Sequence, residues 1–68
     1  MELRDLLEYL GQGSMVALSF DDTNEIELIK VREALSKYND PNLKIELVTL
    51  YRADDGQQYI RINVEKQE

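Results

Sequence analysis

The sequence predicts a small two-layer α+β domain, in which three strands form one mixed sheet and two helices cover one face of that sheet. Two segments space their apolar residues three and four positions apart, as one face of a helix does. Three other segments carry continuous or alternating apolar residues, which is typical of strands. The chain has 68 residues and shows no linker or repeat, so we expect residues 1–68 to form a single domain in the order α-β-α-β-β.

The first two elements are a short helix and a strand. Residues 1–10 are predicted as the helix, because their leucines fall on one face: Leu3, Leu6, Leu7 and Leu10. Gly11 and Gly13 supply the stop at its C-terminal end. Residues 14–20 are predicted as the strand, and their nearly continuous apolar content indicates that both faces of this strand are partly covered.

Residues 22–38 carry the strongest helix pattern. Asp22 is the expected N-cap, with Glu25 three residues later as its capping-box partner. The stripe expected to face the core consists of Leu28, Val31, Ala34, Leu35 and Tyr38. Ile26 and Ile29 point nearly opposite that stripe, because each residue turns a helix by about 100°.

The last two elements form a predicted hairpin, with a strand over residues 43–52 and a return strand over residues 57–65. Alternation assigns one face of the first strand to the core: Leu43, Ile45, Leu47, Thr49 and Tyr51. The opposite face then carries Lys44, Glu46, Val48, Leu50 and Arg52. On the return strand, the residues expected in the core are Ile60, Ile62 and Val64.

The register of this hairpin depends on the length of its loop. The two core faces coincide only for an even number of loop residues, because a slip of one residue turns every side chain over. A two-residue loop sets Glu46 opposite Glu65, a like-charge pair. We therefore expect a four-residue loop, which sets Lys44 opposite Glu65 and Leu50 opposite Tyr59.

The predicted connections also favour one order of strands. A helix joins the first and second strands, so we expect these two strands to run parallel through a right-handed crossover. Insertion of the third strand between them, in the order 1-3-2, gives antiparallel pairing on both sides and is preferred over a position outside.

Charge and composition exclude several classes of function. The net charge is −6, from 14 acidic and 8 basic residues, and the basic residues stand singly between acids. Direct binding of nucleic acid or of a membrane surface requires a basic stripe, so we expect neither. Without cysteine or histidine, disulfides and ordinary zinc sites are excluded, and no cofactor is expected. The absence of a long apolar run or a signal-peptide pattern makes a cytoplasmic protein the expectation.

The usual catalytic residues are also missing. General base chemistry falls to carboxylates, lysine or tyrosine when histidine and cysteine are absent. The sequence holds no glycine-rich phosphate loop, and the acidic stretch that begins at Asp22 fails the EF-hand pattern, with Glu27 where glycine is required. We therefore expect neither an enzyme nor a metal site.

Acidic residues suggest one alternative function. Six of them could line up after folding and imitate nucleic-acid phosphates: Asp21, Asp22, Glu25, Glu27, Asp54 and Asp55. Helix capping and turn formation explain the same residues without any partner, because Asp is common at N-caps and before glycine in hairpin turns.

Surplus apolar residues favour a protein-binding surface. On the hairpin, Val48, Leu50 and Tyr59 fall on the face away from the predicted core, and Arg52 and Arg61 rim them. Tyrosine and arginine are enriched at binding hot spots, and contiguous exposed apolar residues mark interfaces. A second candidate surface is the pair formed by Ile26 and Ile29 on the long helix.

A short, acidic, cysteine-free chain without a catalytic set resembles, in general character, the small accessory proteins that phages and plasmids encode. We predict a non-enzymatic protein-binding module that regulates or inhibits a larger protein. The alternatives are an acidic mimic that blocks a nucleic-acid-binding protein and a structural homodimer. A homodimer is expected in any case, because so thin a core needs further support.

Overall fold

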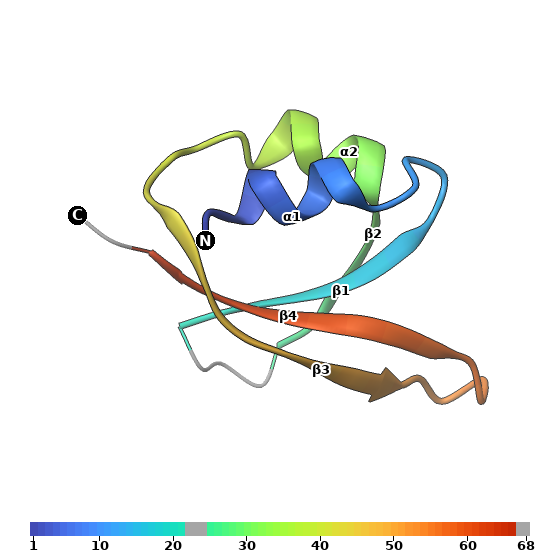
Figure 1. Ribbon diagram of the computed structural model, residues 1–68. Helices are drawn as coiled ribbons and strands as arrows, with labels where there is room; N and C mark the ends of the chain where they lie inside the picture. Colours follow the sequence, from blue (N-terminus) through green and yellow to red (C-terminus); the bar gives the residue numbers. More distant parts are fainter. Residues whose placement is uncertain (22–24, 67–68) are drawn as a thin grey trace.

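The computed structural model describes residues 1–21 and 25–66 (Figure 1). Six elements follow one another along the chain: α1 (Leu3–Tyr9), β1 (Met15–Phe20), β2 (Glu27–Lys30), α2 (Val31–Lys37), β3 (Leu43–Arg52) and β4 (Gln58–Lys66). The four strands form one sheet, and both helices lie on the same face of it (Figure 1). The α+β class is therefore confirmed, whereas the expectation of three strands is wrong.

The order of the strands in the sheet is β2-β1-β4-β3. The last strand of the chain does insert between the first strand and its own hairpin partner, as the sequence predicts. The predicted directions are wrong, because β1 pairs parallel with β4 while β3 pairs antiparallel with β4. Strand β2 causes the difference, since it reverses the chain once more before α2 crosses the sheet to β3.

The expected helix over residues 22–38 is confirmed only for its second half. Glu27–Lys30 pair antiparallel with β1, with Ile29 opposite Val16 and Leu28 opposite Ala17. The expected N-cap, Asp22, lies outside the described residues, and Glu25 precedes β2, so it does not cap a helix. Pairing with β1 gives the backbone amides of this segment partners that the first turn of a helix would lack.

Helix α2 begins without a side-chain cap, and backbone carbonyl groups take that role. The residue before the helix, Lys30, donates or accepts no capping bond through its side chain. Instead, the amide of Val31 donates to the carbonyl of Ser14 at 2.8 Å, and the amide of Arg32 donates to the carbonyl of Gln12 at 3.1 Å. The loop after α1 thus satisfies two of the four amides that every helix start leaves open.

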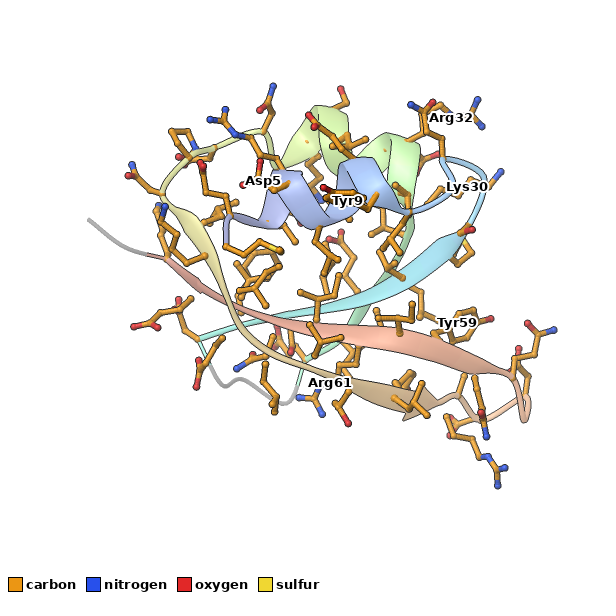
Figure 2. The ribbon with its side chains drawn as sticks, viewed as in Figure 1. Asp5, Tyr9, Lys30, Arg32, Tyr59 and Arg61 are labelled. Carbon is orange, nitrogen blue, oxygen red and sulfur yellow. The ribbon has the colours of Figure 1, made fainter. Side chains whose placement is uncertain are left out.

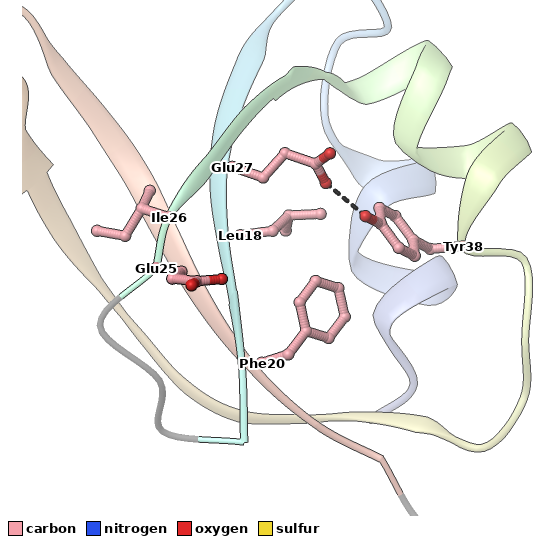
Figure 3. A pocket seen from close by; sticks show the side chains of 6 residues that line it. All are labelled: Leu18, Phe20, Glu25, Ile26, Glu27 and Tyr38. Atoms are coloured by element: carbon pink, nitrogen blue, oxygen red, sulfur yellow. Dashed lines mark hydrogen bonds between the residues drawn. The ribbon is translucent and has the colours of Figure 1, made fainter.

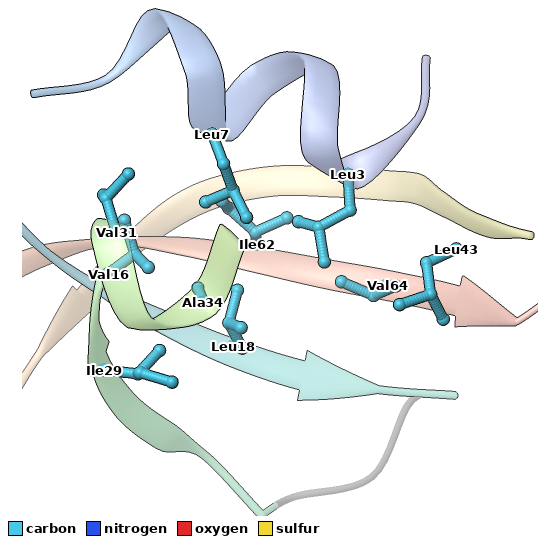
Figure 4. Close-up of a cluster of buried hydrophobic side chains, with 10 residues drawn as sticks. All are labelled: Leu3, Leu7, Val16, Leu18, Ile29, Val31, Ala34, Leu43, Ile62 and Val64. Carbon is cyan, nitrogen blue, oxygen red and sulfur yellow. The ribbon is translucent and has the colours of Figure 1, made fainter. Parts of the chain in front are cut away.

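The core lies between the helices and the sheet (Figure 4). Its buried apolar side chains are Leu3, Leu7, Val16, Leu18, Ile29, Val31, Ala34, Leu43, Ile62 and Val64. The leucine stripe of the first helix is confirmed, since Leu3 and Leu7 are fully buried and Leu6 and Leu10 are partly buried. The stripe predicted for the second helix is partly wrong: Leu28 is exposed, and Ile29 is buried in its place.

The β3–β4 hairpin closes with a three-residue loop, so the expected even loop is wrong. The amide of Gly56 donates to the carbonyl of Ala53, the amide of Ala53 donates to the carbonyl of Gln57, and Gly56 has a φ of 87°. This is the turn followed by a left-handed residue that loops of three residues commonly use. Lys44 nevertheless stands opposite Glu65, as predicted.

An irregularity at Glu46 reconciles the odd loop with that register. Ile45 pairs with Val64 and Leu47 pairs with Asn63, so Glu46 is an extra residue on β3. A bulge of this kind exchanges the two faces of the strand beyond it. Before Glu46, Leu43 and Ile45 face the helices; beyond it, the even-numbered residues do.

Candidate interaction surface

The bulge reverses the predicted faces of β3 along its outer half. Val48 pairs with Ile62 and Leu50 pairs with Ile60, and cross-strand partners point to the same side of a sheet. Since Ile62 is fully buried under the helices, Val48 and Leu50 lie on the helix side. The assignment of Leu47, Thr49 and Tyr51 to the core is therefore wrong.

The helices do not extend over the outer half of the hairpin, which projects beyond them (Figure 1). Three neighbouring apolar side chains on the helix side are exposed as a result: 49 % for Val48, 70 % for Leu50 and 37 % for Ile60. We call these three residues the hairpin patch. An exposed group of contiguous apolar side chains is the usual mark of an interaction site.

The surface predicted from the sequence is divided between the two sides of the sheet. Val48, Leu50 and Arg52 share the helix side, because they alternate regularly beyond the bulge. Tyr59 and Arg61 alternate with Ile60 and lie on the opposite, open side. Figure 2 shows Arg61 on the side away from the helices. The predicted island of Leu50 beside Tyr59 does not form.

On the open side, Arg61 belongs to a chain of polar side chains. Its Nε donates to Ser19 Oγ at 3.4 Å, and Ser19 Oγ donates to Asn63 Oδ1 at 3.0 Å. Asn63 Nδ2 donates to Glu46 Oε2 at 3.1 Å. Ser19 is fully buried, so these bonds satisfy polar groups that would otherwise destabilise the fold. This bonding gives Arg61 a structural role and also holds the bulge residue.

The second candidate surface, on Ile26 and Ile29, is not formed either. Ile29 is only 7 % exposed and belongs to the core, next to Val16. Ile26 precedes β2 and is half-buried. Both residues lie at the opposite edge of the sheet from the hairpin patch.

A separate polar cluster surrounds Glu27, in a depression lined by Leu18, Phe20, Glu25, Ile26, Glu27 and Tyr38 (Figure 3). The Glu27 carboxylate accepts hydrogen bonds from the Tyr38 hydroxyl and from Lys37 Nζ, the latter at 2.9 Å. The rings of Phe20 and Tyr38 lie 5.1 Å apart. The sequence offered no signal for this cluster, because ten residues separate Glu27 from Lys37.

Electrostatics at Glu27 favour structure over catalysis. Hydrogen bonds from Tyr38 and Lys37 lower the pKa of the Glu27 carboxyl below its ordinary value of 4.5. Burial and the bond to Glu27 raise the pKa of Tyr38, and the bond to Glu27 raises that of Lys37. A general base is tuned toward neutrality, and these shifts go the other way. All three groups keep the protonation states that hold them together.

The acidic residues considered for phosphate mimicry do not gather on one surface. Asp21 lies near the C-terminal end of β4, where its Oδ1 accepts from the amide of Lys66. Asp54 and Asp55 lie in the loop before β4, and β4 is nine residues long, or about 30 Å at about 3.3 Å per residue. Asp22 lies outside the described residues. Within residues 1–21 and 25–66, no cluster of three or more acidic side chains is arranged to bind a metal ion.

Each helix of the described chain has only seven residues, and neither is long and apolar enough to cross a bilayer. Comparisons of the chain with protein-family models, with curated proteins and with solved structures found no match.

Proposed function

We propose that this chain is a non-enzymatic protein-binding module, and that the projecting β3–β4 hairpin is its binding element. The exposure of the hairpin patch carries the proposal, because Val48, Leu50 and Ile60 form adjacent apolar surface without helix cover. The role of a cytoplasmic regulator or inhibitor of a larger protein belongs to the same proposal.

Two features of the hairpin support a protein as the partner. Polar residues border the hairpin patch: Arg52 lies on the same side of β3, and the acidic residues of the loop follow it. A polar rim around an apolar centre is typical of protein interfaces. The net charge of −6 and the basic residues that stand singly along the sequence favour a protein over nucleic acid as the partner.

Site-specific photo-cross-linking in the native cell tests the proposal. A photoreactive phenylalanine analogue at Leu50 should give an adduct with another protein, heavier than two copies of this chain. The matched control is the same analogue at Tyr9, which is 85 % exposed on α1 and distant from the hairpin (Figure 2). The control should give no such adduct.

The dependence of binding on salt concentration distinguishes an apolar interface from electrostatic mimicry of nucleic acid. At about 1 M salt the screening length falls to about 3 Å, so contacts between exposed charges weaken steeply while apolar contacts persist. The Leu50 adduct should therefore survive high salt. Equal adducts from both positions, no adduct, or an adduct only of the mass of two copies would overturn the proposed function.

A further inference from the structure

Strand β3 ends the sheet, and only part of its outer edge is covered. The amide of Ile45 donates to the carbonyl of Met1 at 2.9 Å, and Glu2 forms an antiparallel bridge with Lys44. The N-terminal residues thus cover the edge before the bulge. Beyond it, residues 47–52 pair with β4 on one side and with no other strand of the described chain. We call this uncovered segment the open edge.

Backbone geometry identifies the groups that the open edge presents. The amide of Ala53 donates to the carbonyl of Gln57 across the hairpin. In an antiparallel pair the bonded residues alternate, so Tyr51, Thr49 and Leu47 bond to β4. Val48, Leu50 and Arg52 therefore direct their amide and carbonyl groups outward. These groups form a regular template for one more strand.

The side chains of the open edge are apolar on both sides of the sheet. Val48 and Leu50 lie on the helix side, and Leu47, 58 % exposed, lies on the open side with half-buried Tyr51. Strands that are apolar on both sides are normally flanked by other strands. Edge strands that remain single usually carry charges or proline at such positions, and here the charges come only at the two ends, at Glu46 and Arg52.

We propose that a second copy of this chain pairs antiparallel with the open edge, around a two-fold axis at Thr49. This inference goes beyond the proposed function, because the partner at the open edge is a second copy of this chain and not the larger protein that the proposed function names. In this register Leu47 of each copy stands opposite Tyr51 of the other, and Val48 stands opposite Leu50. The outward backbone groups of Val48 and Leu50 face each other and complete their hydrogen bonds.

Apolar matching selects this register from its neighbours. With the axis at Thr49, every apolar side chain of residues 47–51 stands opposite an apolar side chain of the other copy. Neighbouring registers that keep the backbone bonds shift the axis by one residue. An axis at Leu50 sets Val48 opposite Arg52, which places an apolar side chain against a charged one on the helix side.

The other neighbouring register is disfavoured for a different reason. An axis at Val48 sets Leu50 opposite the bulge residue Glu46 and moves the paired segment toward the part of the edge that Met1 and Glu2 cover. Only the axis at Thr49 matches apolar with apolar along the whole open edge. It also joins the two hairpin patches side by side on the helix side of one continuous eight-stranded sheet, because cross-strand partners share a side.

Light scattering tests whether the open edge mediates the pairing. The mass is measured from low micromolar to near millimolar protein concentration. The native chain should reach the mass of two copies, and Leu50→Lys should stay at the mass of one, since an edge lysine opposes pairing. Leu28→Lys is the matched control, because Leu28 is also an exposed leucine but lies on the opposite edge strand, β2. It should leave the mass of two copies unchanged.

Disulfide cross-linking tests the register independently of any substitution in the patch. The chain has no native cysteine, so Thr49→Cys introduces a single thiol. Facing residues of a non-hydrogen-bonded pair have Cα atoms about 4.5 Å apart, within the range that a disulfide spans. Thr49→Cys should therefore cross-link rapidly under mild oxidation. Leu47→Cys should not, because the two copies of that residue lie about 13 Å apart at about 3.3 Å per residue.

Three results would overturn the inference: a mass of one copy throughout, a mass of two copies that survives Leu50→Lys, or cross-linking at Leu47→Cys as fast as at Thr49→Cys. Circular dichroism checks that each variant folds. A single-copy mass together with a hairpin adduct to another protein would refute the pairing and leave the proposed function standing. A cross-linked pair whose hairpin contacts nothing else would refute the proposed function alone.

Discussion

At the scale of single residues, Glu27 shows how one carboxylate joins an edge strand to the end of a helix. It lies on β2, and its partners Lys37 and Tyr38 lie at the end of α2. Because α2 follows β2 directly, this contact closes the turn of chain between them. The ionised carboxylate is the form that accepts both hydrogen bonds.

The first prediction concerns the acid stability of this contact. The pKa of Glu27 is lower in the folded chain than its ordinary value of 4.5, so its contribution to stability is present above 4.5 and is lost as the pH falls through the folded value. Urea titrations from neutral pH to below 4.5 should show a smaller acid loss for Glu27→Gln than for the native chain. Tyr38→Phe, which removes the main donor, should also reduce the loss. Equal acid losses in all three chains would contradict this account.

The second prediction compares two adjacent residues of β2. Ile29 is buried in the core and Leu28 is 41 % exposed, although a helix through residues 22–38 would place them the other way round. Ile29→Ala should lower the free energy of unfolding by roughly 2–5 kcal/mol, the usual cost of a buried cavity. Leu28→Ala should cost about 0.5 kcal/mol or less, as exposed substitutions do. Chemical denaturation measures both, and the reverse order would restore the long helix.

At the scale of elements, the hairpin depends on two local devices that act together. The three-residue loop needs a left-handed residue at Gly56, and the bulge at Glu46 returns the apolar residues to the correct faces. Without the bulge, an odd loop would turn Ile45 and Leu43 away from the core. The chain from Asn63 to the Glu46 carboxylate holds the bulge from the open side.

The third prediction tests the loop. A Cβ at Gly56 meets no atom within 4 Å, so any cost of Gly56→Ala comes from its φ of 87°. That substitution should lower the free energy of unfolding by roughly 1 kcal/mol. Gly13 is the control: a Cβ there also meets open space, and no positive φ is required. Gly13→Ala should be neutral or slightly stabilising in thermal unfolding, because alanine restricts the unfolded chain. Equal changes in the free energy of unfolding for Gly56→Ala and Gly13→Ala would show that the positive φ of Gly56 is not the cause.

At the scale of the whole molecule, few side chains hold the fold together. Within residues 1–21 and 25–66, ten apolar residues form the buried cluster, and the outer half of the hairpin extends beyond the helices that cover it. A chain of this size buries only about 60 % of the surface that its unfolded form exposes. Pairing at the open edge would add backbone hydrogen bonds and apolar contacts on the side of β3 that faces away from β4.

The fourth prediction follows from mass action. If the folded chain pairs at the open edge and the unfolded chain does not, the thermal midpoint must rise with protein concentration. Scanning calorimetry of the native chain should show this rise, whereas Leu50→Lys should give a midpoint that is independent of concentration. A rise of the same size in both chains would assign the association to another surface.

The sequence by itself determined those features that depend on local periodicity. The leucine stripe of α1, the strands β1, β3 and β4, and the contact of Ile62 and Val64 with the core follow from spacings of three, four or two residues. The insertion of the last strand rests instead on the expectation of antiparallel pairing on both sides, and the parallel β1–β4 pair shows that this reason is wrong although the order is right. The exposure of Val48 and Leu50 was also expected, but they lie on the helix side of the sheet, and two of the five predicted hairpin residues, Tyr59 and Arg61, lie on the opposite side.

Only the tertiary structure decided between patterns that fit the same residues. The sequence of residues 26–31 is compatible with a helix or with a strand. Pairing with the edge of β1 that β4 leaves open favours the strand for β2. The carbonyls of Gln12 and Ser14, which accept from the first amides of α2, fix the start of the helix at Val31. The regular alternation of residues 43–52 does not reveal the bulge at Glu46, because the bulge depends on the register with β4 and on the hydrogen bond from Asn63. Backbone and buried polar groups must find partners, and which partners are within reach is a property of the assembled sheet.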